Sequence, residues 1–185
     1  VPARAFRCSV LDGIYVRMGA QDALPAGLST FQVELGEASQ ILAAATCRSL
    51  VILDELGRGT STADGLAIAM ATLKHLLAWP QGGQQAEQGL PCPLVFFVTH
   101  YHEVLAEVGR ANGEKVQCLY MDHLVDPAEG SRVTYLYKAR EGTCGSSFGF
   151  SVALKAGLPL KIVERAKQLS TTQGEGEGEE ATRPE

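Results

Sequence analysis

Two short apolar runs that end in polar side chains constrain the fold more than any other feature of this sequence. In the first, Ser49–Glu55, four consecutive apolar residues are followed by two carboxylates. The second, Leu94–His100, repeats the pattern and ends in a histidine. Short apolar runs without alternation, rich in β-branched residues, are typical of strands buried on both faces. They predict a parallel sheet.

The segment between the two runs predicts the helix that connects them. Gly57–Thr62 is a glycine-rich turn, and Ser61 or Thr62 can cap the helix that follows it. Apolar residues then recur at helical spacing, which marks a buried stripe: Leu66, Met70, Leu73 and Leu77. Because strand, helix and strand follow one another at this distance, a right-handed crossover unit is expected.

A second helix is predicted before the first run. Ser29 is a candidate N-cap, and Gln32 completes a capping box. Apolar positions spaced by four and three then define one face: Phe31, Leu35, Ala38, Leu42 and Ala45. A short strand over residues 13–16 is expected to precede this helix.

The remaining segments complete the predicted organisation. Residues 116–124 and 133–138 are expected to pair as a hairpin, and short helices are expected over 151–156 and 160–170. We expect one domain over residues 1–170, with a surface insertion of little order at 80–93, which is rich in Gln and Gly. Residues 171–185 are acidic and glycine-rich, so a disordered tail is expected there. Because residue 1 is not a methionine, the sequence is expected to be a fragment.

Composition limits the functions open to this chain. Its 185 residues are 45% hydrophobic and 20% charged, as in globular proteins, and its net charge is −5. A domain that itself gripped a DNA backbone would normally be basic, so any DNA is expected to be held by other regions. No apolar run is long enough to cross a bilayer. The five cysteines are scattered, and reduced thiols are expected.

The polar ends of the two predicted strands suggest a site. Ligands of open α/β sheets gather at the carboxyl ends of the strands, so Asp54, Glu55 and His100 should emerge close together. Asp54 suits Mg²⁺, Glu55 can take a proton from an attacking water, and His100 can contact a terminal phosphate. A solvated turn and a structural histidine are the plainer alternatives. The glycines, cation and hydroxyls of residues 57–61 favour the functional interpretation.

Several motifs, in order along the chain, resemble the ATPase domain (domain V) of the MutS family of DNA mismatch-repair proteins. Residues 50–62, LVILDELGRGTST, resemble the Walker B and D-loop segment of that family. Residues 17–22 and 27–31 resemble its signature region, and residues 97–103, FVTHYHE, its switch-histidine segment. Residues 142–159 resemble its C-terminal helical closure. Val98 and residues 133–138 are most similar to the eukaryotic subunit that recognises insertion–deletion loops.

The resemblance implies a fold and a set of roles. The fold would be α/β, a P-loop NTPase-like (ABC-ATPase type) parallel sheet flanked by helices, with a short helical C-terminal closure. Asp54 would hold Mg²⁺, directly or through water, Glu55 would be the general base, and His100 would sense the γ-phosphate of ATP. Ser29 would contact the nucleotide of the partner subunit, although a plain N-cap needs no such role. Arg58 would couple the two sites of the dimer.

The resemblance also implies partners. These are another MutS-homologue subunit in a heterodimer, DNA bound through regions absent here, and downstream MutL-type proteins, in the nucleus. Phe148 would pack against the partner subunit or belong to an ordinary core. The sequence contains no G-x-x-x-x-G-K-[ST] motif, so the phosphate-loop (Walker A) part of the fold is missing. The chain alone is therefore expected neither to bind ATP tightly nor to hydrolyse it.

Two other interpretations remain open at this point. One is a different ABC-type chromosome or repair ATPase; those usually carry a Ser-Gly-Gly signature at the helix start, where this chain has Ser29-Thr30-Phe31. The other is a non-catalytic dimerisation fragment or a meiotic MutS homologue. The absent phosphate loop favours truncation, whereas the intact Asp54-Glu55 pair disfavours a long-standing loss of catalysis.

Overall fold

The computed structural model describes residues 4–19, 29–79, 93–111, 115–126, 132–144 and 148–176. The chain divides into two compact units, residues 1–116 and 117–185. The predicted insertion at 80–93 lies almost wholly outside the described residues. Within them, no helix is both long enough and apolar enough to cross a membrane. Cys8 and Cys118 are free thiols, as expected, whereas Cys92 lies outside the described residues.

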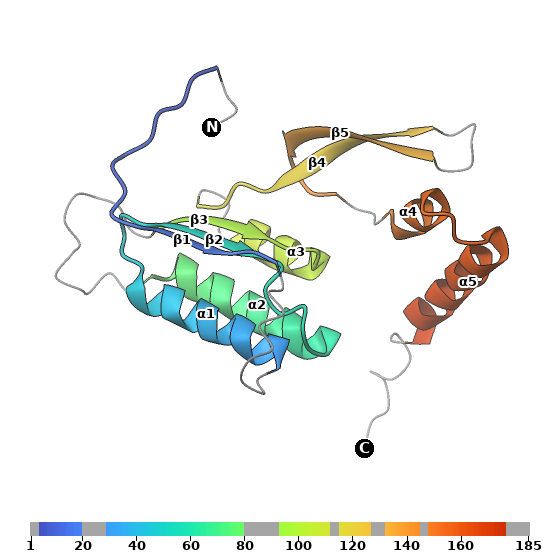
Figure 1. Ribbon diagram of the computed structural model, residues 1–185, viewed down its shortest axis with the longest axis horizontal. Helices are drawn as coiled ribbons and strands as arrows, with labels where there is room; N and C mark the ends of the chain where they lie inside the picture. Colours follow the sequence, from blue (N-terminus) through green and yellow to red (C-terminus); the bar gives the residue numbers. More distant parts are fainter. Residues whose placement is uncertain are drawn as a thin grey trace. The chain divides into compact units, whose positions relative to one another are not determined.

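The first unit is a parallel sheet that carries helices on one face (Figure 1). Its elements in chain order are β1 Ile14–Arg17, α1 Thr30–Ala44, β2 Leu50–Asp54, α2 Thr62–Leu77, β3 Leu94–Val98 and α3 His102–Ala111. The strand order is β1-β2-β3, all parallel, with Leu53 of β2 opposite Arg17 and Phe97. The predicted strand–helix–strand unit is therefore confirmed.

Side chains alternate between the two faces of this sheet. On the helix-covered face, Val51 and Leu53 are fully buried and contact Ile41 of α1 and Leu76 of α2. A neighbouring cluster joins α2 to α3 through buried apolar residues: Ala69, Leu73, Tyr101, Val104 and Val108. Together these two clusters form the core of the first unit.

The opposite face of the sheet is largely uncovered, contrary to the prediction of strands buried on both faces. Leu94, Phe96 and Val98 of β3 are each about half exposed, and so is Val16 of β1. The apolar run of β3 therefore alternates in burial although its sequence does not. An apolar run shows that both faces of a strand can be covered, but it does not show that both are covered.

The buried stripe of α1 is shifted from the predicted one. Its buried residues are Glu34, Ala38 and Ile41, whereas Leu42 and Ala45 are partly buried against the same core. The apolar pattern missed Glu34 because a carboxylate is rarely buried unless it is paired. In α2 the buried residues are Gly65, Ala69, Leu73 and Leu76. Leu73 is as predicted, and the other predicted residues, Leu66, Met70 and Leu77, are partly buried against the same core.

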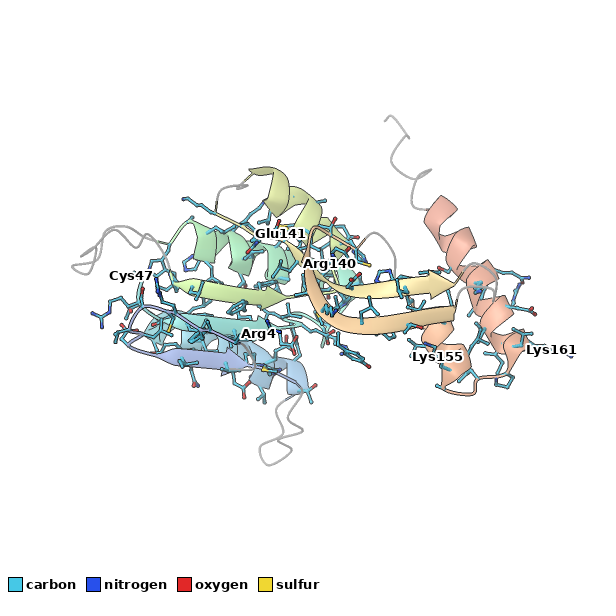
Figure 2. The ribbon with its side chains drawn as sticks, turned by 90° about the horizontal axis from the view of Figure 1, so that it is seen from above. Arg4, Cys47, Arg140, Glu141, Lys155 and Lys161 are labelled. Atoms are coloured by element: carbon cyan, nitrogen blue, oxygen red, sulfur yellow. The ribbon has the colours of Figure 1, made fainter. Side chains whose placement is uncertain are left out.

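The second unit contains a hairpin and two helices. Strands β4 Leu119–Asp126 and β5 Arg132–Glu141 pair antiparallel, as predicted, and form a sheet of their own. Arg140 and Glu141 lie at the end of β5 (Figure 2). Helices α4 Gly149–Lys155 and α5 Leu160–Gly176 correspond to the predicted helical closure. Because α5 continues to Gly176, the disorder predicted from residue 171 is wrong for its first part.

Candidate functional site

The carboxyl ends of β2 and β3 bring the predicted acidic residues and the histidine together. Asp54 is the last residue of β2 and pairs with Val98, the last residue of β3. The Glu55 amide extends this pairing by donating to the Val98 carbonyl oxygen, 2.9 Å away. Glu55 is thereby fixed beside the segment that carries His100, which confirms that the two residues share one edge of the sheet.

The Glu55 side chain lies between a histidine and an arginine. Its Oε1 atom is 3.9 Å from His100 Nδ1, and its Oε2 atom forms an ion pair with Arg58. The Glu55 side chain is 37% exposed and that of His100 is 52% exposed, so solvent or a ligand can reach both. A carboxylate held at one oxygen and open at the other can accept a proton from a water molecule.

Backbone strain marks the same residue. Glu55 has φ +53°, in the left-handed region that non-glycine residues adopt infrequently. Such conformations persist only where the surroundings fix them, and they concentrate at functional sites. The contacts that follow Glu55 are therefore part of the site.

A glycine turn follows Glu55 and contacts α1, α2 and the loop after β3. Gly57 has φ +94°, and its N–H donates to Glu34 Oε1 at 2.6 Å. Its carbonyl oxygen accepts from the Tyr101 hydroxyl at 3.2 Å. A Cβ at Gly57 would lie 2.9 Å from the Gly65 Cα, so this backbone approach requires glycine.

His100 is also oriented by its neighbour. Its ring lies against the Tyr101 ring, with centroids 4.3 Å apart and planes tilted by 35°. The Tyr101 amide donates to Thr99 Oγ1 at 3.0 Å, which shapes the turn between β3 and α3. The ring can therefore present a nitrogen toward Glu55 while its tyrosine neighbour is anchored in the core.

Ser29 occupies the predicted N-cap of α1. Its Oγ accepts from the Gln32 amide at 3.1 Å, so the N-cap prediction is confirmed, whereas the return bond of a capping box stays a prediction. The first turn of α1 also lies against the glycine turn, because a Cβ at Gly59 would be 3.1 Å from Phe31 Cβ. The hydroxyl itself is exposed and makes its hydrogen bond within its own helix, so its contact with a nucleotide stays a prediction.

The donor set at the strand ends fits a hydrated magnesium ion better than a protein-enclosed metal. Among the residues that the structure describes, no group of three or more His, Cys, Asp or Glu side chains could enclose a metal ion. Asp54 lies half-buried next to Glu55 at the strand end. Mg²⁺ is usually held by one or two carboxylates together with waters and substrate phosphates. Asp54 therefore fits the role of its protein ligand.

Sequence reasoning found the acid, the histidine and the arginine but missed the residues behind them. Glu34, Gly65 and Tyr101 all contact the Gly57 peptide and were not singled out. Glu34 carried a signal, since it stands four residues before Ala38 on the buried face of α1. The Phe148 and His123 ring centroids are 4.4 Å apart, so Phe148 has a contact inside the second unit.

An α/β domain with acidic residues and a histidine at the carboxyl ends of adjacent parallel strands has the arrangement of a ligand-binding domain. The particular family follows from comparison with known proteins. Residues 1–173 match the family described as MutS domain V, and the chain therefore belongs to the MutS family. The predicted resemblance is confirmed.

Individual relatives agree with this assignment. The chain is 45% identical to the DNA mismatch repair protein MSH3 of Arabidopsis thaliana over 99% of its length, which is 18% of the relative. It is 43% identical to the probable DNA mismatch repair protein Msh6 of Drosophila melanogaster over 92% of the chain and 14% of the relative. For the MutS protein of Chlamydia muridarum the identity is 42%, over 91% of the chain and 19% of the relative. The chain thus spans less than a fifth of the length of these relatives.

Proposed function

We propose that this chain forms part of the ATPase domain of a DNA mismatch-repair protein of the MutS family. The observation that carries the proposal is the geometry of Glu55 and His100, which face each other at the ends of adjacent parallel strands, 3.9 Å apart. The repair role is supported by the relatives, which are named as DNA mismatch repair proteins. The activity is proposed for the whole protein, since the chain spans only part of its relatives.

Each residue of the site has a role in this proposal. Glu55 accepts the proton of the water that attacks the terminal phosphate, because its Oε1 faces the open side of the site. His100 donates to that phosphate or orients the water. Asp54 would hold the Mg²⁺ that accompanies ATP, and the ion would supply positive charge at the phosphates.

Two further residues connect the site to a second subunit. Ser29 caps a helix whose N-terminus offers free N–H groups and the positive end of the helix dipole to phosphate. We assign to Ser29 the role of contacting the nucleotide bound by a MutS-homologue partner subunit. Arg58 is 72% exposed in its side chain and pairs with Glu55, so a ligand or a neighbouring subunit can reach the same residue that restrains the base. DNA, MutL-type partners and a nuclear location belong to the proposal for the whole protein, as does the preference for insertion–deletion loops expected of an MSH3-like protein.

The decisive experiment is Glu55→Gln in the complete protein together with its partner subunit. ATP turnover is expected to fall by about 10²-fold to 10⁴-fold, the usual contribution of a general base, while ATP binding is retained. Glu107→Gln is the matched control. Glu107 is an exposed carboxylate of α3 that pairs with Lys74 of α2 and is not one of the site residues. Turnover in Glu55→Gln within twofold of the wild-type rate would refute the role of Glu55.

A further inference from the structure

The Gly57 peptide is held from three sides by residues that are far apart in the sequence. Its N–H donates to Glu34 of α1, and its carbonyl accepts from the hydroxyl of Tyr101, which lies just before α3. Its third neighbour is the backbone of Gly65 in α2. Both hydrogen bonds are buried. We refer to these three contacts as the Gly57 clamp.

Burial of the Glu34 carboxylate is unfavourable for folding unless the carboxylate is paired. Glu34 is 7% exposed, and a carboxylate at such a position loses its hydration. Compensation comes from the Gly57 N–H at 2.6 Å and from Arg17, whose Nη2 lies 3.7 Å from Glu34 Oε2. A hydrogen bond to an ionised acceptor is about twice as strong as a neutral one. The buried Glu34 carboxylate therefore binds one backbone amide of the turn, that of Gly57.

The clamp controls the residue at the start of the same turn. The Glu55 amide donates to the Val98 carbonyl, and Gly57 follows two residues later in the turn. Both Glu55 and Gly57 have positive φ values, +53° and +94°. Besides the clamp, the described contacts within this turn are the Arg58 amide bond to the Glu55 carbonyl, at 3.3 Å, and the ion pair of Arg58 with the Glu55 side chain. Both lie within the turn itself, so only the clamp ties its backbone, among these contacts, to α1 and to the segment after β3.

We propose that Glu34 and Tyr101 are positioning residues that hold Glu55 in its reactive orientation through the Gly57 clamp. This inference rests on the proposed function of Glu55 as the general base. It also connects the two sides of the site. Glu34 stands on the helix that Ser29 caps, and Tyr101 directly follows His100, so a shift of either segment reaches Glu55 through the backbone of one residue, Gly57.

The test uses three variants in the complete protein with its partner subunit. Tyr101→Phe removes one hydroxyl and keeps the buried ring. Glu34→Ala removes the acceptor, and Glu34→Gln keeps an oxygen in its place. Two controls match them: Tyr15→Phe removes a hydroxyl that donates to the Ala44 carbonyl at 3.2 Å, and Glu37→Gln alters the other carboxylate near Arg17, 3.0 Å from its Nε. Readouts are kcat and KM for ATP, and amide hydrogen exchange over residues 55–59.

The variants that remove a clamp contact are expected to lower kcat while leaving KM within about twofold. Tyr101→Phe should lower kcat by about 10-fold and Glu34→Ala by up to about 100-fold, since a displacement of about 1 Å in a reacting group costs this much. Exchange over residues 55–59 should be faster by at least about 10-fold in both, because the turn opens locally. Glu34→Gln should restore most of both properties, and the two controls should resemble the wild type.

Each other outcome counts against a defined part of the inference. Faster exchange with unchanged kcat would show that the clamp is structural only, which overturns the positioning role. Unchanged exchange would overturn the clamp itself. If the wild-type complex hydrolyses no ATP, the proposed function fails and this inference with it; an active wild type with variants that match the controls refutes this inference alone.

Discussion

Substitution of Gly65 by alanine tests the closest backbone approach in the site. Gly65 lies in the first turns of α2, and a Cβ there would be 3.1 Å from the Gly57 carbonyl carbon and closer still to its oxygen. The same Cβ would collide with the Tyr101 hydroxyl, which donates to that oxygen. The substitution therefore forces α2 and the glycine turn apart.

The expected change is a sum of opposing terms. Alanine favours a helix over glycine by up to about 1 kcal/mol. Overpacking of a tight contact costs about 1–3 kcal/mol, and loss of the Tyr101 hydrogen bond costs about 0.5–1.5 kcal/mol. With the full helical gain, we therefore expect Gly65→Ala to lower the free energy of unfolding by about 0.5–3.5 kcal/mol, because overpacking and the lost hydrogen bond together exceed that gain.

Chemical denaturation of the protein measures this difference, and the chain contains a matched control. Gly36 lies inside α1, and a Cβ there would meet nothing within 4 Å. Gly36→Ala should therefore stabilise the protein by about 0.5–1 kcal/mol, the helical term alone. If Gly65→Ala shifts the unfolding midpoint in the same direction as Gly36→Ala, the close approach of Gly57 and Gly65 is wrong.

Three further predictions concern the stability of the first unit. Leu53→Ala should cost about 2–5 kcal/mol by opening a cavity beside Val51, because Leu53 is fully buried; denaturant titration measures it. Ser61→Ala should cost about 1 kcal/mol in the same assay, since Ser61 Oγ accepts from the Asp64 amide at 3.2 Å at the start of α2. Asp12 accepts hydrogen bonds from Thr46 and Ser49, which lower the pKa of its carboxyl below the usual 3.8. The ionised Asp12 therefore contributes fully to the free energy of unfolding above pH 3.8, and this contribution is lost as the pH falls through the lowered pKa. Asp12→Asn should reduce the fall in stability over this acid range in denaturation curves taken at several pH values.

Each of these predictions has an outcome that contradicts it. Leu94→Ala is the control for Leu53→Ala, because Leu94 is 54% exposed on the uncovered face; equal losses would contradict the assignment of the two faces. Helix content and stability unchanged by Ser61→Ala would show that the cap is dispensable. An Asp12→Asn protein with the same acid dependence as the wild type would mean that other carboxylates set it.

The fold was predictable where the sequence carries strong local signals. Two apolar runs, each followed by polar residues, gave both β2 and β3, and the distance between them gave the parallel crossover. Caps at Ser29 and Ser61 gave the starts of α1 and α2, because their side chains satisfy backbone amides two or three residues on. Asp54, Glu55 and His100 were predicted together for the same reason, since strand ends of a parallel sheet share an edge.

What the sequence did not reveal depends on contacts between distant segments. Periodicity locates apolar side chains, so it passed over Glu34, whose burial is compensated by the Gly57 amide and Arg17. The need for glycine at position 65 arises from Gly57, which belongs to another element. Burial of the second face of β3 likewise depends on what covers it, and no residue within the strand reports that.

Under the proposed role of Glu55, its left-handed backbone opposes stability and activity at a single position. For a residue with a Cβ, this conformation lowers the stability of the fold by roughly 1–2 kcal/mol, whereas glycine adopts it without steric hindrance. A library randomised at position 55 and sorted for heat resistance would therefore favour glycine and asparagine. If Glu55 is the general base proposed above, the same library, placed in the complete protein and sorted for ATP hydrolysis, is expected to return glutamate. The residue found at position 55 in each sorted pool would then show whether backbone strain or catalysis decided its selection.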